Sequence, residues 1–172
     1  MAIAIYYLVA TVALAAALLL LAGQAGLLAG HTPADLGVHD GRLKPPSPTP
    51  NSVSSQADLH AGSGALVDYA RIAPLAGGED ITATMARLRA AIEAMPGARI
   101  VEARPDYLYV QFTTRWLKFV DDAEFWASPH EGVIHVRSAS RLGSSDYGVN
   151  RARIEQLRWT LAARPHPRPH SQ

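Results

Sequence analysis

An uninterrupted apolar run near the N-terminus constrains the fold of this chain more than any other feature. Residues 1–30 contain no charged side chain, and residues 3–22 are almost purely apolar, with Thr11 the most polar member. An α-helix rises ~1.5 Å per residue, so about 20 such residues cross a bilayer core of ~30 Å. The run therefore predicts a transmembrane anchor over residues 1–30. We expect it to enter the lipid bilayer through residues 3–22.

A cleaved signal peptide is the main alternative for this run, and a buried soluble helix is a third. The segment before the run has no Lys or Arg, and the run exceeds the ~7–15 apolar residues of a usual signal peptide. Both observations favour an uncleaved anchor, although the small residues Gly23 and Ala25 would suit a signal peptidase. Few soluble helices are apolar on all sides over this length.

Composition excludes several classes of function. The 172 residues carry 16 basic and 15 acidic side chains, for a formal charge of +1, so no nucleic-acid partner is expected. The chain has no cysteine, which excludes disulfides, thiol nucleophiles and cysteine metal sites. Its seven histidines are scattered, and it has neither a Gly-x-Ser-x-Gly elbow nor a phosphate-binding loop. We expect no catalytic residue, no metal and no cofactor.

The pattern after the anchor divides the chain into three further parts. Residues 31–56 include the run Lys44-Pro-Pro-Ser-Pro-Thr-Pro50, which predicts an extended, stiff, proline-rich linker. Residues 57–163 have the periodicities of a globular domain. Residues 164–172 contain three prolines, cannot continue a helix, and are predicted to form a flexible tail.

Within the domain, the hydrophobic period changes from that of a helix to that of strands and back. A stripe with spacings of four and three predicts a helix that Asp80 caps and that ends before Pro96; its members are Ile81, Met85, Leu88, Ile92 and Met95. Four strands are predicted over residues 99–103, 107–114, 116–126 and 133–140. Their short connections favour antiparallel pairing. A last helix is predicted over residues 149–163.

The expected fold class is α+β. It comprises an N-terminal single transmembrane helix, then a four-stranded antiparallel sheet with helices packed on one face, in the order α-β-β-β-β-α.

Two groups of polar residues are candidates for a binding site. Asp121, Asp122 and Glu124 lie in the third predicted strand, where Asp122 and Glu124 share a face. The loop before the last helix adds a second group: Arg137, Arg141, Asp146, Asn150 and Arg151. Arginines near a helix N-terminus can bind an anion. The competing interpretation, which we favour, is that the arginines and carboxylates pair with one another.

Four motifs in order give the chain a family resemblance. They are Asp40-Gly-Arg-Leu43, Pro50-Asn-Ser-Val-Ser-Ser-Gln56, Phe119-Val-Asp-Asp-Ala-Glu-Phe125 and the run from Arg137 to Arg151. Together they resemble the domain of unknown function 1499 family from about residue 40 to 163. The resemblance implies an anchored or exported bacterial protein and assigns no activity. The family's usual cysteines are replaced here by Pro46 and Ser52. Their joint loss implies that they form a disulfide in relatives, in an oxidising compartment.

Two functional hypotheses follow. The first is a non-enzymatic, membrane-anchored domain that acts as an accessory or stabilising subunit of a larger membrane protein complex. The second is a binding protein or enzyme for a small anion or a lipid headgroup, with its site at residues 137–151. The few cations after the anchor favour a cytoplasmic domain, whereas the family resemblance favours the periplasm. We expect a single-pass inner-membrane protein with a periplasmic domain.

Overall fold

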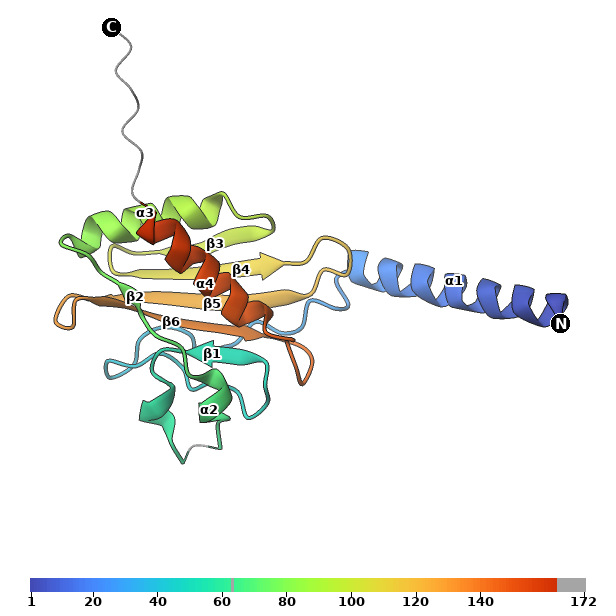
Figure 1. Ribbon diagram of the computed structural model, residues 1–172, viewed down its shortest axis with the longest axis horizontal. Helices are drawn as coiled ribbons and strands as arrows, with labels where there is room; N and C mark the ends of the chain where they lie inside the picture. The colour runs from blue at the N-terminus through green and yellow to red at the C-terminus, as the bar shows by residue number, and fades with distance from the viewer. Residues whose placement is uncertain (63, 164–172) are drawn as a thin grey trace, which may run out of the picture.

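The apolar run forms one long helix that projects from the rest of the molecule in the computed structural model (Figure 1). The structure describes residues 1–62 and 64–163, so the predicted tail at 164–172 lies outside the described residues. Helix α1 spans Ala2–Gln24, and all of residues 1–21 are exposed. A 23-residue helix is ~34 Å long, which is enough to cross a bilayer core.

The domain is built on an antiparallel sheet with more strands than the sequence predicts. The four predicted strands are present as β3 (Ala98–Ala103), β4 (Tyr107–Thr113), β5 (Val120–Ser128) and β6 (Val133–Ser140). Two short strands, β1 (Ser52–Ser54) and β2 (Leu75–Ala76), both pair with β6. The sheet therefore has six strands rather than four, in the order β1-β6-β5-β4-β3 with β2 beside β6.

The third predicted strand begins four residues too early. Residues 114–119 form a turn between β4 and β5, in which Thr114 N donates to Phe119 O at 2.9 Å and Phe119 N donates to Thr114 Oγ1 at 3.0 Å. Lys118 has φ of 56°, in the left-handed region. This local closure, which we call the β4–β5 turn, replaces the first part of the predicted strand.

Helices α3 (Ile81–Glu93) and α4 (Val149–Ala162) pack on one face of the sheet. Asp80 caps α3 as predicted, because its carboxylate accepts from the N–H groups of Thr82 and Ala83. The main core lies between the helices and the sheet and includes Leu88, Ile92, Val110, Phe125, Ile134 and Ile154. Each of these side chains is fully buried. Two shorter helical segments, α2 (Val67–Ala70) and a 3₁₀ turn (Ala57–His60), were not predicted individually.

The other face of the sheet is covered by residues 35–46, which we call the strap. Leu43 is buried against Tyr107 and Tyr109, with Leu36, Val38 and Trp126 packed around them. Further along, Pro46 is buried and residues 52–54 belong to the folded sheet. The segment predicted as a proline-rich linker at 31–56 packs largely against the domain, because its apolar side chains cover one face of the sheet.

Helix α1 joins the domain through close contacts at its C-terminal end. Gly23 is buried, and a Cβ on it would lie 2.6 Å from Leu117 O. Gln24 Nε2 donates to Trp116 O at 2.8 Å. The β4–β5 turn is therefore the part of the domain against which the helix ends.

Candidate functional site

The structure distributes the predicted site residues over both faces of the sheet. Asp121 points toward the helices, whereas Asp122 and Glu124 point toward the strap, as strand alternation requires. Asp146 and Asn150 join Asp121 on the helix side, and Arg137 and Arg141 lie on the strap side. Seven of the eight residues therefore form two separate clusters rather than one pocket, and Arg151 belongs to neither.

The helix-side cluster is centred on Asn150, which is fully buried. Its Nδ2 donates to Asp146 Oδ2 at 2.9 Å and to Asn51 O at 3.2 Å. Its Oδ1 accepts from Ser138 Oγ at 2.5 Å and from Arg153 Nη1 at 2.8 Å. The side chain thus joins β6, the segment before β1 and the first turn of α4.

Asp146 organises the start of α4. Its carboxylate accepts from the N–H groups of Gly148 and Asn150 at 3.0 and 2.9 Å and from the Tyr69 hydroxyl at 2.6 Å. Burial alone would raise the pKa of Asp146, but these hydrogen bonds outweigh burial and lower it. Gly148 has φ of 81°, which its lack of a Cβ permits. This carboxylate acts as a structural cap.

Arg153 and Arg151 also bond to other residues of the domain. Arg153 Nη2 pairs with Asp121 Oδ2 at 2.6 Å, and its guanidinium stacks over the Phe112 ring at 4.3 Å. Arg151 donates to Tyr69 O at 2.5 Å and to Arg71 O at 2.9 Å. It thereby fixes the segment around α2 and lies outside both clusters.

The strap-side cluster begins with a two-pronged ion pair. Arg141 Nε and Nη2 each donate to Asp122 at 2.7 Å, and the Tyr109 hydroxyl donates to the same carboxylate at 2.6 Å. The hydrogen bond from Arg141 to Asp122 raises the pKa of the guanidinium. Asp122 is 1% exposed. This two-pronged geometry neutralises the charges of Arg141 and Asp122 and gives each side chain direct hydrogen bonds.

Glu124 and Arg137 form the second, looser part of the strap-side cluster. Glu124 Oε1 accepts from Gly37 N at 2.7 Å and from the Tyr107 hydroxyl at 2.8 Å. Its Oε2 lies 3.7 Å from Arg137 Nη1, and neither of these two buried atoms has a hydrogen-bond partner among the residues that the structure describes. Burial raises the pKa of Glu124 and lowers that of Arg137. The pair is therefore held together by charge and by the strap rather than by direct hydrogen bonds.

Comparison with known proteins identifies the domain. A family model described as "Protein of unknown function (DUF1499)" matches residues 42–161. The chain belongs to this family. No curated protein and no solved structure matches the chain. The DUF1499 match includes part of the strap, both clusters and nearly all of α4, so these features belong to the family domain rather than to an added linker.

The DUF1499 domain uses its polar clusters mainly to join its own elements. Within residues 1–62 and 64–163, no group of three or more His, Asp or Glu side chains has the arrangement of a metal site. The cluster residues are buried or partly buried, and nearly all their polar atoms contact the domain itself. Such an arrangement fixes the register of strands, strap and helix.

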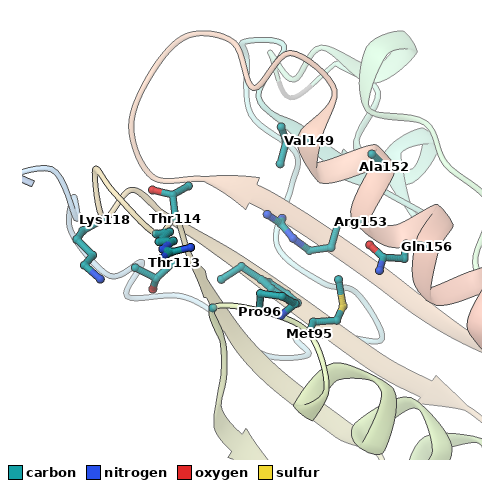
Figure 2. A pocket seen from close by; sticks show the side chains of 12 residues that line it. Met95, Pro96, Thr113, Thr114, Lys118, Val149, Ala152, Arg153 and Gln156 are labelled. Carbon is teal, nitrogen blue, oxygen red and sulfur yellow. The ribbon is translucent and has the colours of Figure 1, made fainter. Parts of the chain in front are cut away.

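A concave feature that sequence reasoning missed lies beside these clusters. A cavity of about 740 Å³ opens between the α3–β3 turn, the end of β4 with the β4–β5 turn, and the first turns of α4 (Figure 2). Met95, Thr114, Lys118 and Val149 line it, and Arg153 reaches it from α4. These residues come from three distant segments, and no local pattern in the sequence joins them.

Proposed function

We propose that this protein is a membrane-anchored, non-catalytic domain that acts as an accessory or stabilising subunit of a larger membrane protein complex. The observation that carries the proposal is α1 itself. The helix is apolar on all sides, and its residues 1–21 are exposed rather than packed against the domain. Only its last residues contact the β4–β5 turn. Its lateral surface is therefore available to lipid and to other transmembrane helices.

The junction supports retention of the helix in the mature protein. Cleavage near residues 23–25 would remove the contacts that Gly23 and Gln24 make with residues 116 and 117. A signal peptide that is cleaved off would make no such contacts with the folded domain. We therefore infer a single-pass protein that enters the bilayer through residues 3–22.

Small residues on one side of α1 support contact with a protein partner. Successive residues are rotated by ~100°, so Ala13, Ala16 and Ala17 fall on one face. Small side chains allow the close approach that drives helix association in lipid. The non-catalytic part of the proposal is supported by the internal pairing of both polar clusters.

We propose that the protein lies in a bacterial inner membrane and that its domain lies in the periplasm. The family resemblance implies cysteines at the positions of Pro46 and Ser52, and both residues are buried here. Ser52 Oγ accepts from Ser47 N at 2.8 Å, so the two positions lie close together in the fold. That proximity supports a disulfide at these positions in relatives, and such disulfides are typical of oxidising compartments.

Purification in mild detergent tests the proposal. We expect the tagged full-length chain to resist carbonate extraction and to migrate on native gels with a membrane protein in fixed stoichiometry. Replacing Ala13 and Ala17 by Leu should release that partner while the chain stays in the membrane. The matched control, Ala4→Leu with Ala15→Leu, adds the same bulk to the opposite face and should retain it. A monomer without a stoichiometric partner contradicts the proposal.

A small-anion or lipid-headgroup site at residues 137–151 has less support. Its cations are engaged: Arg141 by Asp122, Arg151 by two carbonyl oxygens and Arg137 by Glu124. An anion placed there would have to displace these internal contacts.

A further inference from the structure

The cavity of Figure 2 lies at the end of the domain where α1 joins it. Thr114, Arg115 and Lys118 line it, and all three belong to or flank the β4–β5 turn. Residues 116 and 117 of the same turn contact Gln24 and Gly23 at the end of α1. If α1 spans the bilayer, as proposed above, the mouth of this cavity is at the level of the lipid headgroups.

The interior of the cavity is mostly apolar. Met95 and Pro96 come from the α3–β3 turn, and Val149 and Ala152 come from α4 (Figure 2). Phe112 adds a wall from β4. A volume of about 740 Å³ is within the range of small-ligand sites. A free inorganic anion would gain nothing from such walls, whereas a molecule with both a charged and an apolar part would.

The rim of the cavity is positively charged. Within the described part of the chain, no carboxylate lies within 4.0 Å of the Arg115 guanidinium or the Lys118 ammonium. Arg115 stacks over the Trp116 ring at 4.8 Å. Among the residues that the structure describes, no acidic one lines this cavity, and the third cation, Arg153, already pairs with Asp121. Two cations at the rim are therefore without an ion-pair partner.

Exposed apolar side chains surround the same end of the domain. Trp116 is 62% exposed and Tyr147 is 95% exposed, and Leu142 lies close to Gly30, shortly after α1. A second cavity of about 450 Å³, lined by Leu142 and Tyr147, shares Thr114 and Val149 with the first. Tryptophan and tyrosine are enriched at membrane interfaces, where their rings meet both lipid and water. These side chains suit a surface that touches the bilayer.

From these observations we propose that the cavity binds an anionic phospholipid of the bilayer that holds α1. Arg115 and Lys118 would contact the phosphodiester and the anionic headgroup. Met95, Pro96 and Val149 would accept the upper part of an acyl chain. The site differs from the one considered at residues 137–151 in its cations, because Arg115 and Lys118 come from the β4–β5 turn; it shares only Val149 with that range.

Lipid retention by the full-length chain tests this site. The protein is reconstituted in nanodiscs of phosphatidylcholine with a minor fraction of phosphatidylglycerol. It is then extracted in mild detergent, and the retained lipids are counted by native mass spectrometry. We expect phosphatidylglycerol to be enriched over its share of the bilayer. A cation near an anionic lipid surface contributes about fivefold in affinity, so Arg115→Gln with Lys118→Gln should reduce the preference by about 30-fold.

Two further variants separate charge from shape. Ala152→Phe fills the apolar part from an exposed position on α4 and should reduce retention of both lipids without unfolding the domain. Arg42→Gln with Arg89→Gln removes the same charge at exposed positions outside the cavity and should leave the enrichment unchanged. Circular dichroism confirms that each variant is folded.

The outcomes also separate this site from the proposed function. Equal enrichment in the wild type and in the Arg115/Lys118 variant overturns the lipid site. Displacement of the lipid by excess inorganic phosphate overturns it too, in favour of a free-anion site. Release of the chain by carbonate contradicts the membrane anchor, and with it the lipid site. Retention in the membrane with a stoichiometric partner but no lipid enrichment refutes the lipid site alone.

Discussion

Replacing Asn150 by Ala should destabilise the domain by about 3 kcal/mol. The Asn150 side chain makes five hydrogen bonds, at 2.5 to 3.2 Å, within a fully buried site. A typical hydrogen bond contributes about 0.5–1.5 kcal/mol to stability, and a buried group left without its partner costs about 1–3 kcal/mol. The simple sum overestimates the loss, because some of the partners keep other contacts. Asp146 Oδ2 still accepts from the residue-150 N–H, and Asn51 O still accepts from Ser140 N.

Urea unfolding of the full-length chain in micelles, followed by near-ultraviolet circular dichroism, measures this loss. A loss of about 3 kcal/mol should also lower the melting temperature by about 10 °C for a domain of this size. Asn150→Asp keeps the acceptor oxygen but places a carboxylate 2.9 Å from Asp146. It should be at least as damaging at neutral pH and recover in part on acidification.

Gln156→Ala is the matched control, since Gln156 is exposed on the same helix. Its effect should stay within about 0.5 kcal/mol. A loss below about 1 kcal/mol for Asn150→Ala would refute the view that this side chain joins β6, α4 and the segment before β1.

Three other predictions concern the two clusters and the junction. Arg137→Met leaves Glu124 buried without its cation and should cost about 3–5 kcal/mol, whereas Glu124→Gln with Arg137→Met should cost clearly less in the same urea assay. The lowered pKa of Asp146 means that its stabilisation is present above the unfolded-state pKa of about 3.9 and is lost as pH falls through the folded-state value. Asp146→Asn should therefore lower stability at neutral pH and flatten its decline in acid; an unchanged acid decline would contradict this. Gly23→Val forces a side chain against Leu117 O and should speed amide hydrogen exchange in the β4–β5 turn, whereas Ala15→Val should not.

Local hydrophobic periodicity is sufficient to predict the bounds of the helices and strands that are long and half-buried. The helix capped by Asp80 and the strands β4 and β6 were predicted within one or two residues, because their apolar side chains recur at the period of the element. Strands β1 and β2, of three and two residues, are too short to show any period. They exist because the edge of β6 offers unpaired backbone groups, which is a property of the assembled sheet.

The polar clusters could be predicted only in part, for a similar reason. Alternation along β5 correctly separated Asp121 from Asp122 and Glu124. The partners depend on register, which places Glu124 opposite Arg137 and Asp122 opposite Ala139. The role of the strap had no sequence signal, since Gly37 N reaches Glu124 from 87 residues away. The prolines that follow it favoured an extended linker in the sequence. The structure shows instead that an extended segment also suits packing along a sheet.

The segment that follows α1 holds the domain close to the C-terminal end of the helix. A free linker at 31–56 would have held the domain away from the bilayer, and the β4–β5 turn would then have faced water. Instead, Gly23 contacts Leu117, and a Cβ on Gly30 would lie 2.7 Å from Arg141 Cβ. Both ends of the short connection after α1 are thus held against the domain. With α1 in a bilayer, this geometry leaves the β4–β5 turn no position except the interface. The proposed lipid site depends on this constraint, and the exposed Trp116 lies in the same turn.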